Sequence, residues 1–494
     1  MLLTSGGDFF LSIKKVVILH PMKYRFSLIL FLLAAQLSKA QNKYTRGMDF
    51  DDASYSEIPK KAKLSRSLES VPASFSLKKY APIPESQGMY GTCTAWASAY
   101  CGRTIVEAIK NNWTDKKIIT ANAYSPAFLF RMIRPSDPEC VGGSTVSRAF
   151  ELMKEKGLLT YNDLSLACIP SITDQQMATA EKGKIKDYMR LFDINAAENI
   201  KIQSVKKSIS EKKPVVFGMV APPSFMGAKG VWNPTEEPDK SFGGHAMCVV
   251  GYDDAKDGGA FEIQNSWGQA WGNEGYIWVK YADFARFTWY AYEFIDLPEA
   301  KPEVADLSGQ IRLTLADGKD MPANLRISTR GLTVVPAKVA PGPLTLYQTS
   351  QPYTSGTRFR IYISNNEPAY VYAISSDLSN EVAKIFPYED GISAALTDKK
   401  NDVAIPDEDH YIEFDNKPGK DFLCVLYSKN ELDINSLVQK IGSGTGTFSE
   451  RIFKAVGDEM VDPKNVQFST DKIAFQGFSK GKNIVSMMVE LDHQ

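Results

Sequence analysis

The sequence predicts an α+β protein in which a part with helices before strands is followed by a mostly β part. Apolar residues after Cys93 recur with the spacing of one long, largely buried helix. Short apolar runs typical of buried strands begin at Pro214, and beyond residues 299–308 apolar and polar residues alternate. We therefore expect two folded domains, at residues 71–298 and 309–494, joined by a linker at 299–308.

In the first domain, periodicity predicts a helix after Cys93, a second around Val146–Met153 and a short amphipathic one at 204–212. A loop rich in Pro, Gly and charge follows at 221–242. The expected strands are 214–220, 245–252, 261–264 and 276–280.

In the second domain, period-two alternation between turn residues predicts a β-sandwich interrupted by two short helices. The expected strands are 311–315, 359–364, 370–375, 411–414, 422–427 and 485–491, and the expected helices are 434–441 and 448–456.

Length and charge limit the classes of function. A chain of 494 residues is too long for one ordinary domain, and a net charge of −1 gives no field that would attract nucleic acid or an anionic membrane. The sequence offers no metal-ligand cluster or phosphate-binding loop, so we expect no metal and no cofactor. Asp253, Asp254 and Asp257 are interpreted as a charged loop after a strand rather than a cation site.

The N-terminal segment predicts export. Basic residues at 22–25, an apolar run at 26–35 and small residues before Ala40 indicate a secretory signal that is cleaved after Ala40, with Met22 as an alternative start. About ten apolar residues are too few to span a bilayer. A membrane anchor extended by residues 16–19 remains an alternative. We expect a periplasmic, extracellular or cell-surface protein.

Cys93 is the candidate nucleophile. It follows a turn and begins the long helix, and unpaired N–H groups and the helix dipole at such a position favour a thiolate. Six residues upstream, the Gln87 side-chain amide could join the Cys93 backbone N–H in holding an oxyanion.

His245 is the candidate base, because it is the histidine that shares the first folded domain with Cys93. Gly243 and Gly244 precede it and would let another chain approach closely. Asn265 lies twenty residues further on. An amide oxygen that accepts from one ring nitrogen would fix the tautomer and aim the other nitrogen at Cys93.

Three motifs in this order, QGxxGTC, GGHA before VVGY, and NSWGxxWGxxGY, resemble the papain family of cysteine peptidases over residues 71–298. The resemblance implies a papain-like two-lobed fold with a cleft between the lobes. It also implies the site roles: Cys93 as nucleophile, His245 as general base and acid, Asn265 as its orienting partner, Gln87 as oxyanion donor, and Trp267 as a shield over the His245–Asn265 hydrogen bond.

The resemblance further implies that Gly142, Gly143 and Gly244 contact the substrate, although the first two could merely form a turn before the next helix. Cys140 and Cys168 match two disulfide positions of the family, and export permits this bond. Cys101, Cys248 and Cys424 are expected to be buried thiols.

The chain departs from the family pattern in four places. Thr94 follows the nucleophile where an aromatic residue is usual, and Tyr90 replaces a disulfide cysteine. The long spacing between Cys93 and His245 points to an insertion, for which 221–242 is the candidate. Residues 41–70 lack a long helical propeptide pattern, so they fit a short inhibitory pro-segment or a flexible spacer.

The motifs together predict a secreted, monomeric cysteine endopeptidase that hydrolyses polypeptides through a thioester, without nucleic-acid partners. An exopeptidase, with 221–242 blocking the cleft, is one alternative. Another is an inactive papain-like scaffold of a cell-surface protein whose β domain binds the ligand.

The C-terminal domain resembles a bacterial family of unknown function that is often joined to secreted or signalling enzymes. The resemblance rests on YTSGTRFRIYISNNEPAYVYAIS and the segments after it. We identify no nucleophile and base there, and His410, beside acidic residues, is interpreted as a solvated turn histidine.

Overall fold

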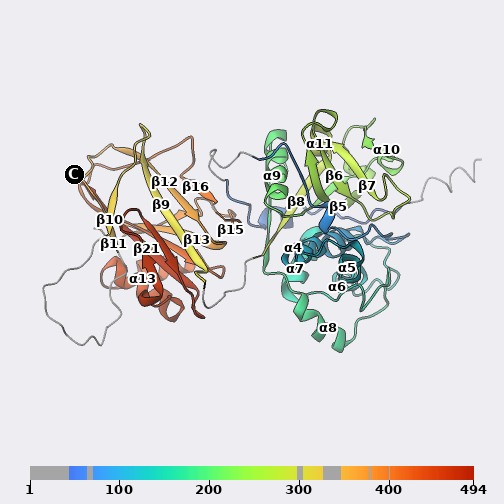
Figure 1. Cartoon of the computed structure of the whole chain (residues 1–494), viewed down its shortest axis with the longest axis horizontal. Helices are drawn as coiled ribbons and strands as arrows, with labels where there is room; N and C mark the ends of the chain where they lie inside the picture. Colours follow the sequence, from blue (N-terminus) through green and yellow to red (C-terminus); the bar gives the residue numbers. More distant parts are fainter. Residues whose placement is uncertain are drawn as a thin grey trace, which may run out of the picture. The chain divides into compact units, whose positions relative to one another are not determined.

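The computed structural model describes residues 44–63, 71–296, 304–325, 346–377, 379, 381–399 and 401–494 (Figure 1). The expected signal peptide with its cleavage site after Ala40, and the first half of the expected linker, residues 299–303, lie outside the described residues. Among those described, no helix is both long and apolar enough to cross a membrane.

The first half of the peptidase-like domain is helical. One unbroken helical run extends from Cys93 to Lys110, as α3 (Cys93–Ala95), the π-helical segment η3 (Trp96–Arg103) and α4 (Thr104–Lys110). The long helix expected to begin at Cys93 is therefore present. The other helices of this half are α5 (Lys116–Ala121), α6 (Pro126–Ile133), α7 (Val146–Glu155) and α8 (Asp174–Ala180).

The second half is a sheet in the order β2-β8-β3-β5-β6-β7-β4, and β1 pairs with β5. Figure 1 shows this sheet on one side of the domain and helices α4 to α8 on the other. The strands are β1 (Ser74–Ser76), β2 (Asp187–Arg190), β3 (Val215–Val220), β4 (Val231–Trp232), β5 (Gly244–Asp253), β6 (Ala260–Gln264), β7 (Tyr276–Lys280) and β8 (Thr288–Ile295).

Three helices accompany the sheet: α9 (Glu198–Ser210), α10 (Pro223–Met226) and α11 (Tyr281–Phe287). The prediction of a helix at 204–212 was wrong at its start, because α9 begins at Glu198. Lys201 is buried in its first turns, where its ammonium donates to the carbonyls of Ala285 and Thr288. Lys201 interrupts the apolar pattern of the buried face, so the sequence did not show a helical period in the first turns of α9. Part of the expected 221–242 loop also has regular structure, in α10 and β4.

The nucleophile helix packs directly on the sheet. Gly102 makes this close approach possible, because a Cβ there would lie 2.7 Å from the Val216 side chain and 2.8 Å from that of Phe294. Strand β5, which carries His245, lies between β3 and β6, and its first nine residues are buried. The beginning of the helix and the beginning of β5 therefore face one cleft.

The C-terminal domain is mostly β, as expected, and has two sheets. Side chains from both sheets, including Leu313, Ile361, Val425 and Met487, form one hydrophobic core. A seven-stranded sheet has the order β10-β11-β21-β18-β13-β14 with β15 on β13, and a six-stranded sheet has the order β16-β12-β9-β20-β19 with β17 on β12.

The strands of this domain are β9 (Leu307–Leu315), β10 (Ala323–Leu325), β11 (Leu346–Thr349), β12 (Arg358–Asn365), β13 (Ala369–Ser376), β14 (Val382–Phe386), β15 (Ala395–Leu396), β16 (Asp402–Ile405), β17 (Ile412–Glu413), β18 (Gly419–Ser428), β19 (Val466–Phe468), β20 (Ala474–Gly477) and β21 (Ile484–His493). Helices α12 (Ile434–Gly442) and α13 (Phe448–Val456) pack on the seven-stranded sheet.

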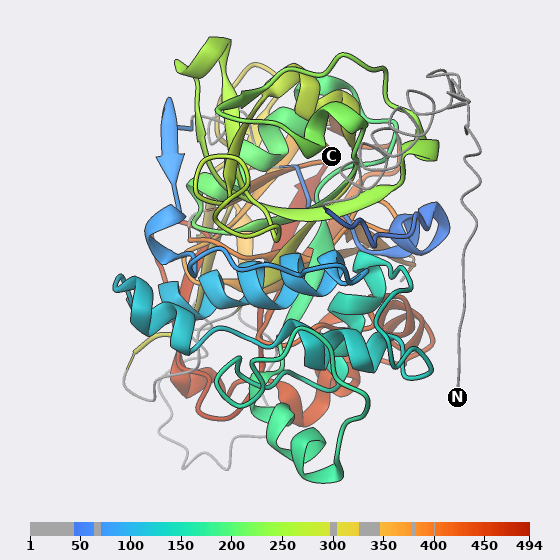
Figure 2. The same ribbon diagram turned by 90° about the vertical axis from the view of Figure 1, so that its right-hand side faces the viewer.

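Residues 46–63, which we call the strap, pack on the peptidase-like domain. Their helix α2 (Asp52–Glu57) was not predicted, since Tyr55 is its one buried residue and six residues carry no period. The Tyr55 hydroxyl donates to the Phe192 carbonyl at 2.8 Å. In Figure 2 the strap, dark blue, runs between the helical half and the sheet.

Candidate active site

The sulfur of Cys93 lies at the start of the helical run and is completely buried. Burial raises its pKa to about 11, although the backbone N–H groups of Ala246 and Gly47 donate to the sulfur and partly oppose this. The expectation of a thiolate was therefore wrong for this conformation. The helix N-terminus is present, but the strap covers the sulfur and removes the water that would stabilise its charge.

His245 and Asn265 form the expected pair. Their Nε2 and Oδ1 atoms are 2.8 Å apart, and the Ser266 backbone N–H also donates to this Oδ1 at 2.7 Å. Since an amide oxygen only accepts, Nε2 carries the proton and Nδ1 has the lone pair that a general base needs. Among the described residues, Nδ1 has no hydrogen-bond partner.

Trp267 covers this pair. Its ring stacks on the His245 ring at a centroid distance of 4.5 Å and an interplanar angle of 21°. Burial, together with the charge of Arg46, lowers the His245 pKa to about 4, against a partly compensating bond to Asn265. The ring is therefore neutral at pH 7, and the closed cleft holds a thiol and a neutral imidazole instead of an ion pair.

Gln87 is tied to the same loop. Its Nε2 donates to the Tyr90 carbonyl at 2.8 Å, and its Oε1 accepts from the Ser266 hydroxyl at 2.6 Å. The Gln87 backbone N–H also donates to the Ser266 carbonyl, at 2.8 Å. Ser266, which sequence reasoning missed, therefore links the segment before Cys93 to the Asn265 loop. Its place directly after Asn265 was the available signal.

The strap lies between the two walls of the cleft. The Met48 N–H donates to the Gly244 carbonyl at 3.2 Å on the sheet side. On the helical side, Ser144 donates to the Gly47 carbonyl at 2.9 Å and accepts from the Asp49 N–H at 3.0 Å. The strap backbone thus makes a short β-ladder with both walls, and Met48 is 4% exposed.

Of the three glycines predicted to contact the substrate, two contact the strap and one does not. A Cβ on Gly143 would collide with the Asp49 carboxylate, and one on Gly244 would collide with the Met48 carbonyl. A Cβ on Gly142 would instead meet the Arg134 guanidinium at 2.6 Å. Gly244 therefore lets the strap backbone come close, whereas Gly143 makes room for the Asp49 side chain and Gly142 for Arg134.

The strap does not present a peptide bond for cleavage. The group of Gly47 that faces the sulfur is an N–H, whereas attack requires a carbonyl carbon there. A Cβ on Gly47 would collide with the Gly91 carbonyl in the loop before Cys93. The strap thus fills the cleft without being a substrate in this position.

Polar contacts hold the strap on either side of the sulfur. The Arg46 guanidinium donates to the carbonyls of Ala221, at 2.8 Å, and Phe242, at the two ends of segment 221–242. The Asp52 carboxylate accepts from the Tyr290 hydroxyl and pairs with Lys240 at 2.8 Å. The strap therefore passes through the cleft along its length.

Cys140 and Cys168 form a disulfide in the structure, and Cys101, Cys248 and Cys424 are buried free thiols. The Gly91 N–H donates to the Cys140 carbonyl at 2.8 Å. The bridge therefore supports the loop from which the nucleophile helix begins.

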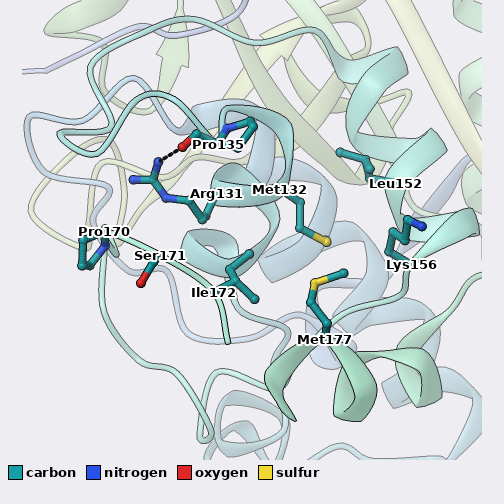
Figure 3. A pocket seen from close by; sticks show the side chains of 9 residues that line it. All are labelled: Arg131, Met132, Pro135, Leu152, Lys156, Pro170, Ser171, Ile172 and Met177. Carbon is teal, nitrogen blue, oxygen red and sulfur yellow. Dashed lines mark hydrogen bonds between the residues drawn. The ribbon is translucent and has the colours of Figure 1, made fainter. Parts of the chain in front are cut away.

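An open cavity of about 390 Å³ lies elsewhere in the helical half, between α6, α7 and the chain around Ile172 (Figure 3). Arg131, at its edge, is satisfied by backbone carbonyls, including that of Ile169 at 2.8 Å. The cavity beside Trp96, Ala246 and Asn265 has a volume of only about 10 Å³. A cavity of this size holds no more than about one water molecule.

The aspartates after β5 and His410 are the remaining candidate residues from the sequence, and the structure gives each an ordinary polar partner. Asp254 pairs with Lys206 at 2.6 Å, and no cluster of possible metal ligands occurs among the described residues. His410 is exposed and bonded to Asp407 at 2.8 Å, as a turn histidine would be.

Sequence reasoning overlooked one polar group in the C-terminal domain. His493 Nε2 lies 3.0 Å from Ser355 Oγ, and its Nδ1 lies 3.5 Å from Asp421 Oδ2. The ring is buried and stacks on Phe414 at 4.8 Å. The Ser355 N–H also bonds to the Gln494 carbonyl, so this group fastens the end of β21 to the neighbouring loop.

Comparisons with known proteins found two family models that match parts of the chain. Residues 78–286 match the model of the papain family cysteine proteases, and residues 352–431 match DUF4384, a domain of unknown function. An uncharacterized peptidase C1-like protein of Acanthamoeba polyphaga mimivirus is 28% identical over 227 residues, which are 42% of this chain and 68% of that protein.

Mouse cathepsin K is 27% identical over 42% of this chain, and Vigna mungo vignain is 28% identical over the same share. The chain spans 59% and 54% of the length of these two relatives. Among solved structures, xylellain, a cysteine protease from Xylella fastidiosa, is 22% identical with a TM-score of 0.40, covering 51% of this chain and 96% of its own.

The matched range includes His245 and Asn265, which are hydrogen-bonded to each other, and Cys93, whose sulfur accepts from the backbone N–H of Ala246, the residue after His245. Residues 78–286 are therefore similar to the papain family of cysteine proteases, which are hydrolases, and residues 352–431 are similar to the DUF4384 family.

Proposed function

We propose that the protein is an exported cysteine endopeptidase that is latent until its strap leaves the cleft. The observation that carries this proposal is the His245–Asn265 pair, stacked under Trp267 beside the N–H of Ala246 that contacts the Cys93 sulfur. The Cys140–Cys168 disulfide supports export, because such bonds persist in oxidising compartments.

The chemistry begins when the strap is gone. His245 Nδ1 takes the Cys93 proton, and the thiolate attacks the substrate carbonyl carbon while the Cys93 N–H and Gln87 Nε2 hold the oxyanion. The imidazolium then gives its proton to the leaving amine, which leaves a thioester. Water, deprotonated by His245, attacks the thioester, and the sulfur departs as the acid forms.

The path of the strap favours an endopeptidase over an exopeptidase. Strap residues contact the walls on both sides of the sulfur, from Arg46 at the insertion to Asp49 at Ser144. The insertion at 221–242 therefore leaves room for a chain that continues in both directions. An exopeptidase requires a closed end.

The place of Met48 suggests what a substrate side chain would meet. Its sulfur and methyl group lie over Gly218, and Tyr290 borders the same glycine. An unbranched apolar side chain fits this pocket, so we propose substrates with such a residue near the cut.

The test is to treat the purified protein, with and without mild acid, with a thiolate-directed epoxide and to map the adduct by mass spectrometry. The proposal requires the adduct on Cys93 and no casein cleavage by Cys93→Ala. An adduct elsewhere, or cleavage by Cys93→Ala, would refute it. A protein that binds polypeptide but never cleaves it would favour the scaffold alternative.

A further inference from the structure

We propose that the C-terminal domain has a binding function of its own: it holds the strap in the cleft by gripping residues 58–62. The proposal rests on the latent peptidase described above and adds a part to it. The strap enters the cleft at Arg46 and ends at the boundary between the peptidase domain and the C-terminal domain.

The grip begins with the backbone. The Lys60 N–H donates to the Gly391 carbonyl at 2.5 Å, and the Ser393 N–H donates to the Lys60 carbonyl at 2.7 Å. On the other side, the Arg190 N–H donates to the Pro59 carbonyl at 3.0 Å, and the Lys61 N–H donates to the Arg190 carbonyl at 2.8 Å. Lys60 of the strap thus bridges the end of edge strand β2 and the C-terminal domain.

A buried charge cluster lies at the same place. The Lys61 ammonium contacts the carboxylates of Glu211 and Glu293, each at 2.8 Å. The C-terminal domain completes the cluster, because the Thr397 hydroxyl donates to the second oxygen of Glu293 at 3.2 Å. Glu293 is completely buried, so its loss of a partner is costly.

The third contact is apolar. Ala62, 6% exposed, belongs to the hydrophobic core of the C-terminal domain together with Ile392 and Phe386. The same domain also holds β2, since Met189 packs with Tyr370 and Tyr372 and the Tyr370 hydroxyl donates to Asp187 at 3.2 Å. The strap at Ala62 and strand β2 are therefore both anchored to the C-terminal domain.

These contacts have one consequence for the cleft. Without the C-terminal domain, Lys60 would lose both backbone partners and Ala62 its apolar surroundings, so the strap would be held by the peptidase domain alone. A coupling of this kind changes an equilibrium by about 5–150-fold. We therefore expect weakening of the grip to open the cleft, although no residue of the grip touches Cys93.

The test compares two Ala→Asp changes in the full-length protein. Ala62→Asp puts a carboxylate into the core of the C-terminal domain, whereas Ala53→Asp puts the same group on an exposed strap position. Hydrogen exchange of the strap amides 47–49, measured by mass spectrometry, reports release of the strap from the cleft and does not depend on peptidase activity. We expect Ala62→Asp to raise their exchange by about tenfold and Ala53→Asp to leave it unchanged.

Because Ala62→Asp puts a charge into a hydrophobic core, a milder second variant, Thr397→Val, tests the grip without disrupting the whole domain. It removes only the hydroxyl that reaches Glu293, with Thr445→Val, at an exposed position of the same domain, as its control. Exchange in β21 reports whether the domain remains folded. Unchanged exchange of 47–49 in both Ala62→Asp and Thr397→Val would overturn the proposal. Faster exchange without epoxide labelling of Cys93 would support the grip and count against the peptidase.

Discussion

Gly47 of the strap lies so close to Gly91 that a Cβ on Gly47 would collide with the Gly91 carbonyl. Gly91 belongs to the loop that begins the nucleophile helix, and the Gly47 N–H points at the Cys93 sulfur. A residue without a side chain is thus what lets the strap reach the nucleophile.

We predict that Gly47→Ala opens the cleft. The added methyl group cannot fit beside Gly91, and overpacking of this kind costs roughly 1–3 kcal/mol. Cys93 labelling by the epoxide should therefore become about 5–150-fold faster. Gly442→Ala is the matched control, because a Cβ there meets nothing within 4 Å. Equal labelling rates in the two variants would contradict this account of the strap.

We predict that mild acid opens the cleft. The His245 pKa falls from its ordinary 6.5 to about 4 in the closed conformation, chiefly through burial and also through Arg46. A lowered pKa stabilises the closed form fully above pH 6.5, and this stability is lost as pH falls through 4. At 1.36 kcal/mol per pH unit, the whole effect is about 3 kcal/mol.

Cys93 does not oppose this trend. Its raised pKa, about 11, favours the closed form below pH 9 and ceases to do so only above that value. Hydrogen exchange of residues 47–49, corrected for intrinsic pH dependence, should rise between pH 6.5 and 4. The rise should be smaller in His245→Gln. Equal protection at pH 7 and pH 4 would show that His245 does not govern opening.

We predict that Asn265→Ala, in a protein opened by Gly47→Ala, reduces kcat/KM by about 10²-fold or more. Nε2 of His245 loses its acceptor, and a correctly placed general base contributes 10²–10⁴-fold. Asn265→Asp keeps an acceptor and adds a negative charge, so it should retain more activity and move the acidic limb of the pH profile to higher pH. Full activity in Asn265→Ala would show that Asn265 does not orient His245.

We predict that reduction of the Cys140–Cys168 bridge destabilises the protein. The bridge closes a loop of 28 residues, and the chain-entropy relation gives about 3–4 kcal/mol for this length. Urea unfolding followed by tryptophan fluorescence should show this loss after treatment with a thiol reductant. The variant Cys140→Ser/Cys168→Ser should unfold early with or without reductant. If the reductant destabilises this variant by the same amount, the loss of stability does not come from the Cys140–Cys168 bridge.

The residues of the cleft could be named from the sequence because each lies in a local motif. Asn265 and Trp267 lie in one run of aromatic and glycine residues, and His245 follows two glycines. Six strands of the C-terminal domain, β9, β12, β13, β17, β18 and β21, were predictable for a similar reason, since period-two alternation marks a sheet with one buried face, whereas its other strands were not predicted.

The closed state could not be predicted in this way. Met48 contacts Gly244, which lies 196 residues further along the sequence, and no local sequence pattern predicts such a contact. The thiolate prediction failed for the same reason, because the helix terminus is local whereas the burial of Cys93 depends on the strap. The grip on Ala62 is likewise tertiary, because its partners lie more than 300 residues further along the chain.

The most direct measurement is cleavage of an end-blocked peptide with an unbranched apolar residue near the cut. It compares Gly47→Ala with Gly47→Ala/Cys93→Ala at pH 6. We predict turnover by the first variant and none by the second, with the unmodified protein slower than Gly47→Ala. Turnover that survives the loss of Cys93, or no turnover by Gly47→Ala although its strap amides exchange freely, would contradict the account.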